Sequence, residues 1–177
     1  LYDSIDLKLL DQPGIRVETN LCYLPNNENN LVWKAADLLM REFSLPGGIS
    51  IRLKKMIPVA AGMAGGSSDA AAVLFGVNRM FGLGLSMEEL KKRGVTIGAD
   101  VPYCLMRGTA RSEGIGEILT PLPPAPQCAV LLAKPRVSVS TKWVYTNLNA
   151  NGLRPEDHPD IDGIAEAIRR GDLREMA

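Results

Sequence analysis

The sequence predicts an α+β fold, and three observations support this prediction. Two stretches near the N-terminus alternate apolar and polar residues with period two, as half-buried antiparallel strands do. Later stretches place apolar residues at helical spacing. A proline-rich segment at residues 121–126 then predicts a boundary, which divides the chain into units 1–125 and 126–177.

Composition indicates a soluble globular protein that recognises a small molecule. Of the 177 residues, 46% are hydrophobic and 23% charged, so disordered, collagenous and membrane classes are disfavoured. The 20 basic and 20 acidic residues balance, which argues against nucleic-acid binding. A chain of this length has room for one sizeable core, or one core and part of a second.

Cysteine usage favours a reducing cytoplasm. Cys22, Cys104 and Cys128 are odd in number and far apart, so they predict neither a disulfide framework nor a metal or redox pair. The start of the chain has neither a signal peptide nor an initiating Met. We therefore expect a trimmed or excerpted piece.

The elements of the first unit follow in order. Strands are expected at residues 5–9 and 15–19, antiparallel to one another, followed by a helix that Asn30 caps and that stops before Pro46. A strand at 49–53 leads into a loop of small residues and a helix at 70–81. Ser86 and Glu89 form a capping box for a helix ending near Gly94, and strands at 108–119 turn at 114–116.

The second unit is expected to begin with a strand at residues 128–133, buried on both faces because its apolar run is continuous. An alternating pattern at 137–139, a helix from Thr141 and an amphipathic helix at 161–168, terminated by Gly171, follow. This unit looks incomplete where the sequence stops.

The loop at residues 62–68 is the strongest candidate for a binding site. Gly62, Gly65 and Gly66 allow backbone amides to approach phosphate oxygens at the start of a helix, and Ser67 and Ser68 add hydroxyl groups. No Lys follows the glycines, so the loop is not a P-loop, and the spacing of its glycines does not match the GxGxxG fingerprint. The alternative is a helix entry that needs glycine for close packing, with Ser67 as its cap.

Other polar and aromatic residues have a structural and a functional interpretation. Asp100 either caps a short helix or orients a substrate hydroxyl. Lys54 and Lys55 are most simply solvated edge charges, although they lie close enough to the loop to reach a nucleotide. Trp143 and Tyr145 either pack in a core or stack on a planar base. His158, the only histidine, is expected on the solvated surface.

Residues 58–72 resemble the second signature of the GHMP kinases, a superfamily of small-molecule kinases. Together with the Gly-Ala-Asp-Val-Pro turn at 98–102, Gly-Ile-Gly-Glu at 114–117 and Lys-Pro at 134–135, the chain is similar to the family of 4-diphosphocytidyl-2-C-methyl-D-erythritol kinases. The resemblance implies a domain like ribosomal protein S5 domain 2, then the start of a ferredoxin-like α/β domain, with both ends of the fold missing. It also implies a bacterial cytoplasmic enzyme.

The activity implied by this resemblance is transfer of the ATP γ-phosphoryl group, with Mg²⁺, to the 2-hydroxyl of the cytidylyl-linked methylerythritol. The matching positions place residues 62–68, namely Gly62, Met63, Ala64, Gly65, Gly66, Ser67 and Ser68, on the ATP phosphates. Asn30, Leu31 and Lys55 match the adenosine side, and Asp100 matches the group acting on the hydroxyl. Tyr145 and Thr141 match the substrate side, where Tyr145 would stack on cytosine.

Three departures from the family's pattern qualify the expectation. The N-terminal motif with a catalytic lysine and the C-terminal glycine-rich motif are absent from this sequence. Ala60 and Ala64 stand where some relatives have glycine, a mild change if both keep negative φ. A different GHMP kinase, or a GHMP-fold binding protein without catalysis, therefore remains an alternative. We expect a monomer or homodimer, with no nucleic acid or membrane partner and no protein-bound metal.

Overall fold

The computed structural model describes residues 1–134, 140–148, 152–154, 156 and 158–176. The chain separates into two compact units, one made of residues 1–107 and 112–119, the other of residues 108–111 and 120–177. In the described part of the chain, no helix is both long and apolar enough to cross a membrane.

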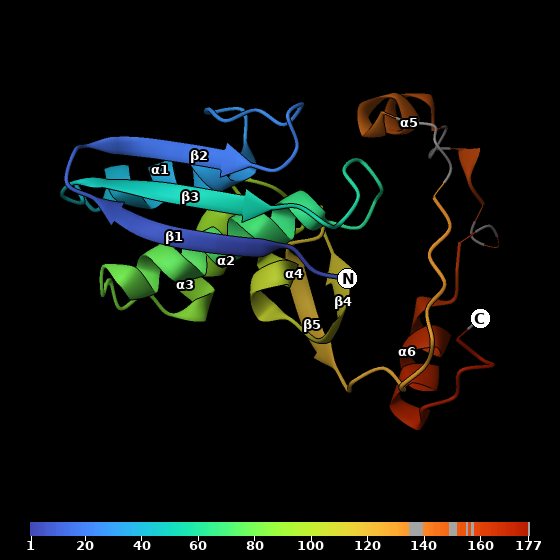
Figure 1. Ribbon diagram of the computed structural model, residues 1–177. Helices are drawn as coiled ribbons and strands as arrows, with labels where there is room; N and C mark the ends of the chain where they lie inside the picture. Colours follow the sequence, from blue (N-terminus) through green and yellow to red (C-terminus); the bar gives the residue numbers. More distant parts are fainter. Residues whose placement is uncertain (135–139, 149–151, 155, 157, 177) are drawn as a thin grey trace. The chain divides into compact units, whose positions relative to one another are not determined.

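A three-stranded sheet organises the first unit (Figure 1). Strands β1 (Ser4–Leu10) and β2 (Gly14–Thr19) flank β3 (Gly48–Lys54), with β1 antiparallel and β2 parallel to it. The two N-terminal strands therefore run in opposite directions, as predicted, but β3 lies between them. The middle position follows from the burial of β3, whose Ile49, Ile51 and Leu53 are almost entirely covered.

Helices α1 (Leu31–Glu42) and α2 (Gly65–Met80) cover one face of this sheet (Figure 1). Helix α1 connects the parallel strands β2 and β3, as a parallel pair requires. Both predicted helices are confirmed, and their apolar stripes build the core with β3. The largest fully buried side chains of this core include Val32, Leu39, Ile49, Ile51, Val73, Leu74 and Val77.

Two short helices and a hairpin follow α2. Helix α3 (Met87–Gly94) begins with the predicted capping box, in which the Ser86 hydroxyl accepts from the Glu89 amide and the Glu89 carboxylate accepts from the Ser86 amide. Helix α4 (Val101–Met106) packs against α2 and α3. Strands β4 (Thr109–Glu113) and β5 (Ile118–Leu122) pair in a separate sheet, also as predicted.

The second unit contains helices α5 (Thr141–Asn147) and α6 (Ile161–Arg170). Gly171 ends α6 in the left-handed conformation, with φ of 69°, which confirms the predicted terminator. The strand predicted at 128–133 is wrong: this segment is irregular, and Leu131 is 94% exposed. A strand buried on both faces needs neighbouring strands, and no strand follows β5 among the described residues. The pattern predicted at 137–139 lies outside them.

Candidate functional site

The loop between β3 and α2 has an unusual backbone. Every second residue has positive φ: 52° at Ala60, 67° at Gly62 and 49° at Ala64. In proteins generally, a run of residues that alternate between left- and right-handed conformations turns successive amide groups toward one side, where they bind anions. Alanine at positions 60 and 64 was expected to be a mild change only if both residues kept negative φ, and neither does. Each left-handed alanine costs about 1–3 kcal/mol.

Helix α2 begins at Gly65 without a side-chain cap. Ala64 is the N-cap residue and makes no side-chain cap hydrogen bond. The predicted alternative of Ser67 as the cap is therefore wrong, because Ser67 lies within the first turn. The first amide groups of a helix have no intrahelical acceptor, and the helix dipole favours an anion beside them. The Ser68 hydroxyl donates to the Gly65 carbonyl at 2.9 Å.

The three glycines of the loop serve different purposes. A Cβ at Gly62 would meet open space, so this glycine serves the left-handed turn. A Cβ at Gly65 would lie 2.8 Å from Cγ2 of Ile57 and 3.0 Å from Nζ of Lys55, and one at Gly66 would lie 3.2 Å from Cδ1 of Leu31. Close packing therefore brings the predicted residues Leu31 and Lys55 to the start of α2.

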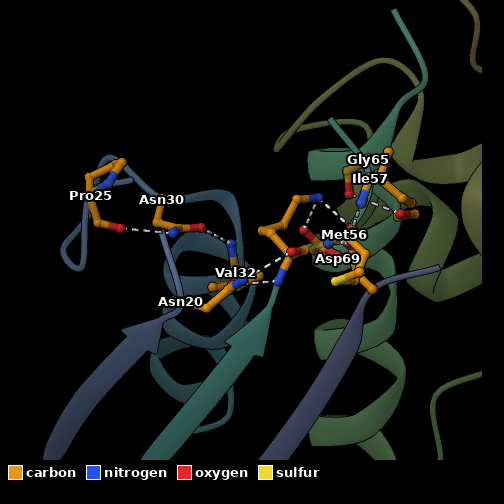
Figure 2. Close-up of polar contacts among 11 residues, drawn as sticks. Asn20, Pro25, Asn30, Val32, Met56, Ile57, Gly65 and Asp69 are labelled. Carbon is orange, nitrogen blue, oxygen red and sulfur yellow. Dashed lines mark hydrogen bonds and ion pairs between the residues drawn. The ribbon is translucent and has the colours of Figure 1, made fainter. Parts of the chain in front are cut away.

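Lys55 lies directly after β3 and is buried, its side chain only 4% exposed. Its ammonium group donates to Asp3, just before β1, and to Asp69 on α2 at 2.9 Å. The interpretation as a solvated edge charge is wrong for Lys55, although Lys54 is exposed. Asp3 also accepts from the amides of Met56 at 2.5 Å and Ile57 at 2.8 Å, and Figure 2 shows this group of contacts. We call Asp3, Lys55 and Asp69 the charge cluster.

Burial and pairing oppose one another within the charge cluster. Burial raises the pKa of Asp69, the hydrogen bond and charge of Lys55 oppose this rise, and the charge of Asp3 adds to it. The net result is a pKa of about 6. Burial also raises the pKa of Asp3, but hydrogen bonds from Lys55, Ile57 and Met56 outweigh it and leave that pKa lowered. Burial lowers the pKa of Lys55, yet its bonds to both carboxylates leave the pKa raised, so the ammonium stays charged.

Two asparagine side chains hold the backbone around this site (Figure 2). Asn30 is 8% exposed; it accepts from the amide of Val32 at 3.1 Å, confirming the predicted cap, and donates to the Pro25 carbonyl at 2.8 Å. Asn20 accepts from the Lys55 amide at 2.7 Å and donates to the Lys55 carbonyl at 3.1 Å. The backbone that enters the loop is therefore tied to the end of β2.

Asp100 lies in a turn that contacts the first turn of α2. A Cβ on Gly98 would lie 3.8 Å from Oγ of Ser67, which sets this turn beside the helix start. Asp100 precedes α4 and Pro102 falls in its first turn, as predicted, but the exposed Asp100 side chain makes no cap hydrogen bond. Burial, together with the charges of Asp100 and Asp69, raises the pKa of the Cys104 thiol to about 11.

A cavity of about 560 Å³ borders the charge cluster, large enough for a small-molecule ligand. Its lining includes Asp3, Ser68, Asp69, Phe75 and Cys104. The described residues contain no group of three or more His, Cys, Asp or Glu side chains arranged to hold a metal ion.

The aromatic residues of the second unit are exposed. Trp143 is 63% and Tyr145 72% exposed, so the interpretation as core packing is wrong. Thr141 opens α5, but its side chain lies outside the described part of the structure. His158 is exposed, as predicted, and all three cysteines are free thiols.

Sequence analysis missed Asp3, Asp69 and Asn20 as site residues. Asp69 belongs to the quoted signature, and its position in the second turn of a helix of small residues could have marked it. Asp3 pairs with a residue 52 positions away and Asn20 with one 35 positions away. Nothing in the local pattern around either residue indicates such a partner.

The family model and the sequence relatives that this chain matches are all described as kinases. Residues 30–108 match the family model described as GHMP kinases N terminal domain. Two proteins named 4-diphosphocytidyl-2-C-methyl-D-erythritol kinase, from Lachnoclostridium phytofermentans and Lachnospira eligens, are each 58% identical to this chain over 177 residues. Both alignments cover 100% of this chain; they cover 60% of the first protein and 61% of the second. The chain thus spans about 60% of the length of these curated relatives.

Solved structures agree with the sequence relatives. One titled as the crystal structure of 4-(cytidine 5'-diphospho)-2C-methyl-D-erythritol kinase has a TM-score of 0.69 and 33% identity, covering 96% of this chain and 59% of that one. A homoserine kinase from Cytophaga hutchinsonii has a TM-score of 0.77 at 20% identity, covering 98% and 62%, and shows the fold alone. The predicted α+β kinase fold is confirmed.

Proposed function

We propose that this chain belongs to the GHMP kinase superfamily and is part of an ATP-dependent kinase acting on the 2-hydroxyl of 4-diphosphocytidyl-2-C-methyl-D-erythritol. The observation that carries the proposal is the loop of alternating left-handed residues that leads into the uncapped start of α2. Such a backbone suits the phosphate oxygens of ATP. The names of the relatives supply the acceptor.

In the proposed site, residues 62–68 hold the triphosphate. Asn30 and Leu31 at the start of α1, with Lys55 after β3, border the adenosine. Because the Lys55 ammonium is already paired with two carboxylates, Lys55 shapes this pocket and provides no free charge. We assign residues 1–125 to the nucleotide-binding domain and 126–177 to a second domain, from which Tyr145 stacks on cytosine and Thr141 contacts the same substrate.

The proposed reaction needs a positioned nucleophile more than a strong base. Asp100 accepts the proton of the substrate hydroxyl as its oxygen bonds to the γ-phosphorus. The bond between that phosphorus and the β,γ-bridging oxygen breaks, and ADP leaves with the electron pair. The amides of the loop stabilise the charge on the phosphate oxygens. Mg²⁺, bound to the phosphates of ATP, would supply further neutralisation.

The test is phosphoryl transfer by the complete gene product. ATP is offered with a panel of the cytidylyl-linked methylerythritol, mevalonate, homoserine and galactose, and ADP and the phosphorylated product are measured. The proposal expects turnover with the first acceptor. Turnover only with another alcohol would indicate a different GHMP kinase, and ATP binding without any transfer would indicate a non-catalytic binding protein. We further propose a cytoplasmic enzyme, either monomer or homodimer.

A further inference from the structure

The charge cluster contacts the start of α2, next to the proposed phosphate-binding loop at residues 62–68. The Cβ that alanine would add to Gly65 falls 3.0 Å from Nζ of Lys55, so the ammonium touches the first residue of α2. Asp69 extends from the next turn of the same helix to the same nitrogen. Any movement of the Lys55 side chain would therefore move the start of α2 or leave Asp69 buried without its partner.

The cluster also fixes both ends of the loop. Asp3 binds the amides of Met56 and Ile57, the two residues after Lys55, while Asp69 anchors the helix that follows the loop. The side chains of Asp3, Lys55 and Asp69 are each only 3–4% exposed. Buried charges persist only when they are paired, so this arrangement sets one geometry for the loop.

The charges do not cancel. One ammonium between two carboxylates leaves a net negative charge below a site that would receive several negative oxygens. Buried charges are weakly screened, so this surplus opposes the triphosphate. Protonation of one carboxylate would remove the surplus, and Asp69 is the member that takes a proton more readily than an ordinary aspartate.

We propose, on the basis of the proposed function, that Asp69 is a positioning residue for the triphosphate. Through Lys55 it holds the first turns of α2 against the end of β3, and the charge on its carboxylate opposes the phosphate. Binding of ATP then draws a proton onto Asp69. Asp69 does not contact the reacting atoms.

Among the other titratable groups near Asp69, Tyr2 and Arg107 line the same cavity. Lys55 follows β3 and Asp3 precedes β1, and both are held in the cluster. From α4 the thiol of Cys104 faces the same region, and its raised pKa keeps it neutral near pH 7. On α1, Asp37 and Arg41 pair with each other at 2.7 Å.

The test compares Asp69→Asn and Asp69→Ala with the unaltered protein, in the complete gene product. Asparagine keeps an oxygen for the Lys55 ammonium but carries no charge, whereas alanine removes both. MgATP binding is measured by calorimetry from pH 5.5 to 8, in two buffers of different ionisation enthalpy that report proton uptake. ATP KM and kcat are measured in parallel. Titration of the nucleotide itself is common to all variants.

The unaltered protein is expected to take up more protons on binding than Asp69→Asn, and to lose affinity more steeply as the pH rises. A shift of one unit in the pKa of Asp69 corresponds to about tenfold in affinity. Asp69→Asn is expected to match or exceed the unaltered affinity at pH 8. Asp69→Ala is expected to change the ATP KM by a larger factor than it changes kcat. Asp69→Asn is expected to restore the ATP KM.

Glu42→Gln is the matched control, because it removes a carboxylate that pairs with Arg93 at 2.9 Å elsewhere in the same unit. It is expected to leave ATP binding unchanged. Equal proton uptake and equal pH profiles in the unaltered protein and Asp69→Asn would overturn the inference alone. Failure of the unaltered protein to bind ATP at any pH would overturn the proposed function and this inference with it.

Discussion

Gly65 is packed against the ammonium of Lys55 so closely that a Cβ at position 65 would lie 3.0 Å from Nζ, and 2.8 Å from Cγ2 of Ile57. The start of α2 and the end of β3 therefore meet without room for one further methyl group. This contact explains why a glycine stands at the first residue of the helix. It also makes the loop sensitive to small changes beneath it.

Gly65→Ala is expected to lower the free energy of unfolding by about 1–3 kcal/mol, because the added methyl overpacks Ile57 and Lys55. The helical preference of alanine offsets only part of this loss. Denaturant unfolding followed by circular dichroism measures the change. Gly98→Ala is the control, since its Cβ would make ordinary contacts at 3.6 and 3.8 Å. Equal stability of both variants would contradict the packing argument.

Ala64→Gly is expected to raise the free energy of unfolding by about 0.5–1 kcal/mol, because it relieves the left-handed backbone at φ of 49°. The same denaturant experiment checks it. Ala72→Gly, at an exposed position within α2, should instead lower stability by about 1 kcal/mol. A loss of stability in both variants would show that Ala64 is not strained.

Asn30→Ala is expected to lower the free energy of unfolding by about 1–2 kcal/mol, since the Val32 amide and the Pro25 carbonyl both lose a partner. Thermal and denaturant unfolding measure this loss. Asn29→Ala changes the exposed neighbour and keeps the backbone amide that bonds to Asn27. A loss in Asn29→Ala as large as in Asn30→Ala would rule out a specific role for the cap.

The stability of the unaltered protein should depend on Asp69 between about pH 4 and 6. The folded pKa, raised from 3.8 to about 6, means that the folded state binds more protons than the unfolded state in this window. The contribution of Asp69 to stability therefore falls as the pH rises through the window, by on the order of 2 kcal/mol. Asp3, with its pKa lowered, contributes stability that is lost only below its ordinary value of 3.8.

Asp69→Asn is expected to remove this component, so that its unfolding free energy relative to the unaltered protein increases from pH 4 to pH 6. Urea unfolding at several pH values gives the difference directly. A constant difference across the window would mean that Asp69 is ionised throughout it.

Asp100→Asn is expected to reduce kcat by about 10²–10⁴-fold in the complete gene product and to leave the ATP KM nearly unchanged, because the amide cannot accept the hydroxyl proton. Steady-state kinetics with both substrates separates the two effects. Asp6→Asn, an exposed change on β1, serves as the control. Near-normal turnover in Asp100→Asn would remove Asp100 from the proposed mechanism.

Local patterns were sufficient for most of the first unit and for the end of α6 in the second. The cap at Asn30, the capping box at Ser86 and the terminator at Gly171 depend on contacts within one helical turn, which a short stretch of sequence contains. The strand expected at 128–133 failed for the opposite reason. Its burial required neighbouring strands that its own residues could not specify.

By itself, the sequence determined the order of the helices and strands in the first unit and the place of the glycine loop, because periodicity, caps and glycines act over a few residues. Only the tertiary structure decided that Lys55 is buried between Asp3 and Asp69 and that Ala60 and Ala64 adopt left-handed backbones. A charge becomes buried when distant segments pack around it, and a strained φ persists when the surrounding fold holds it. Neither condition can be read from neighbouring residues.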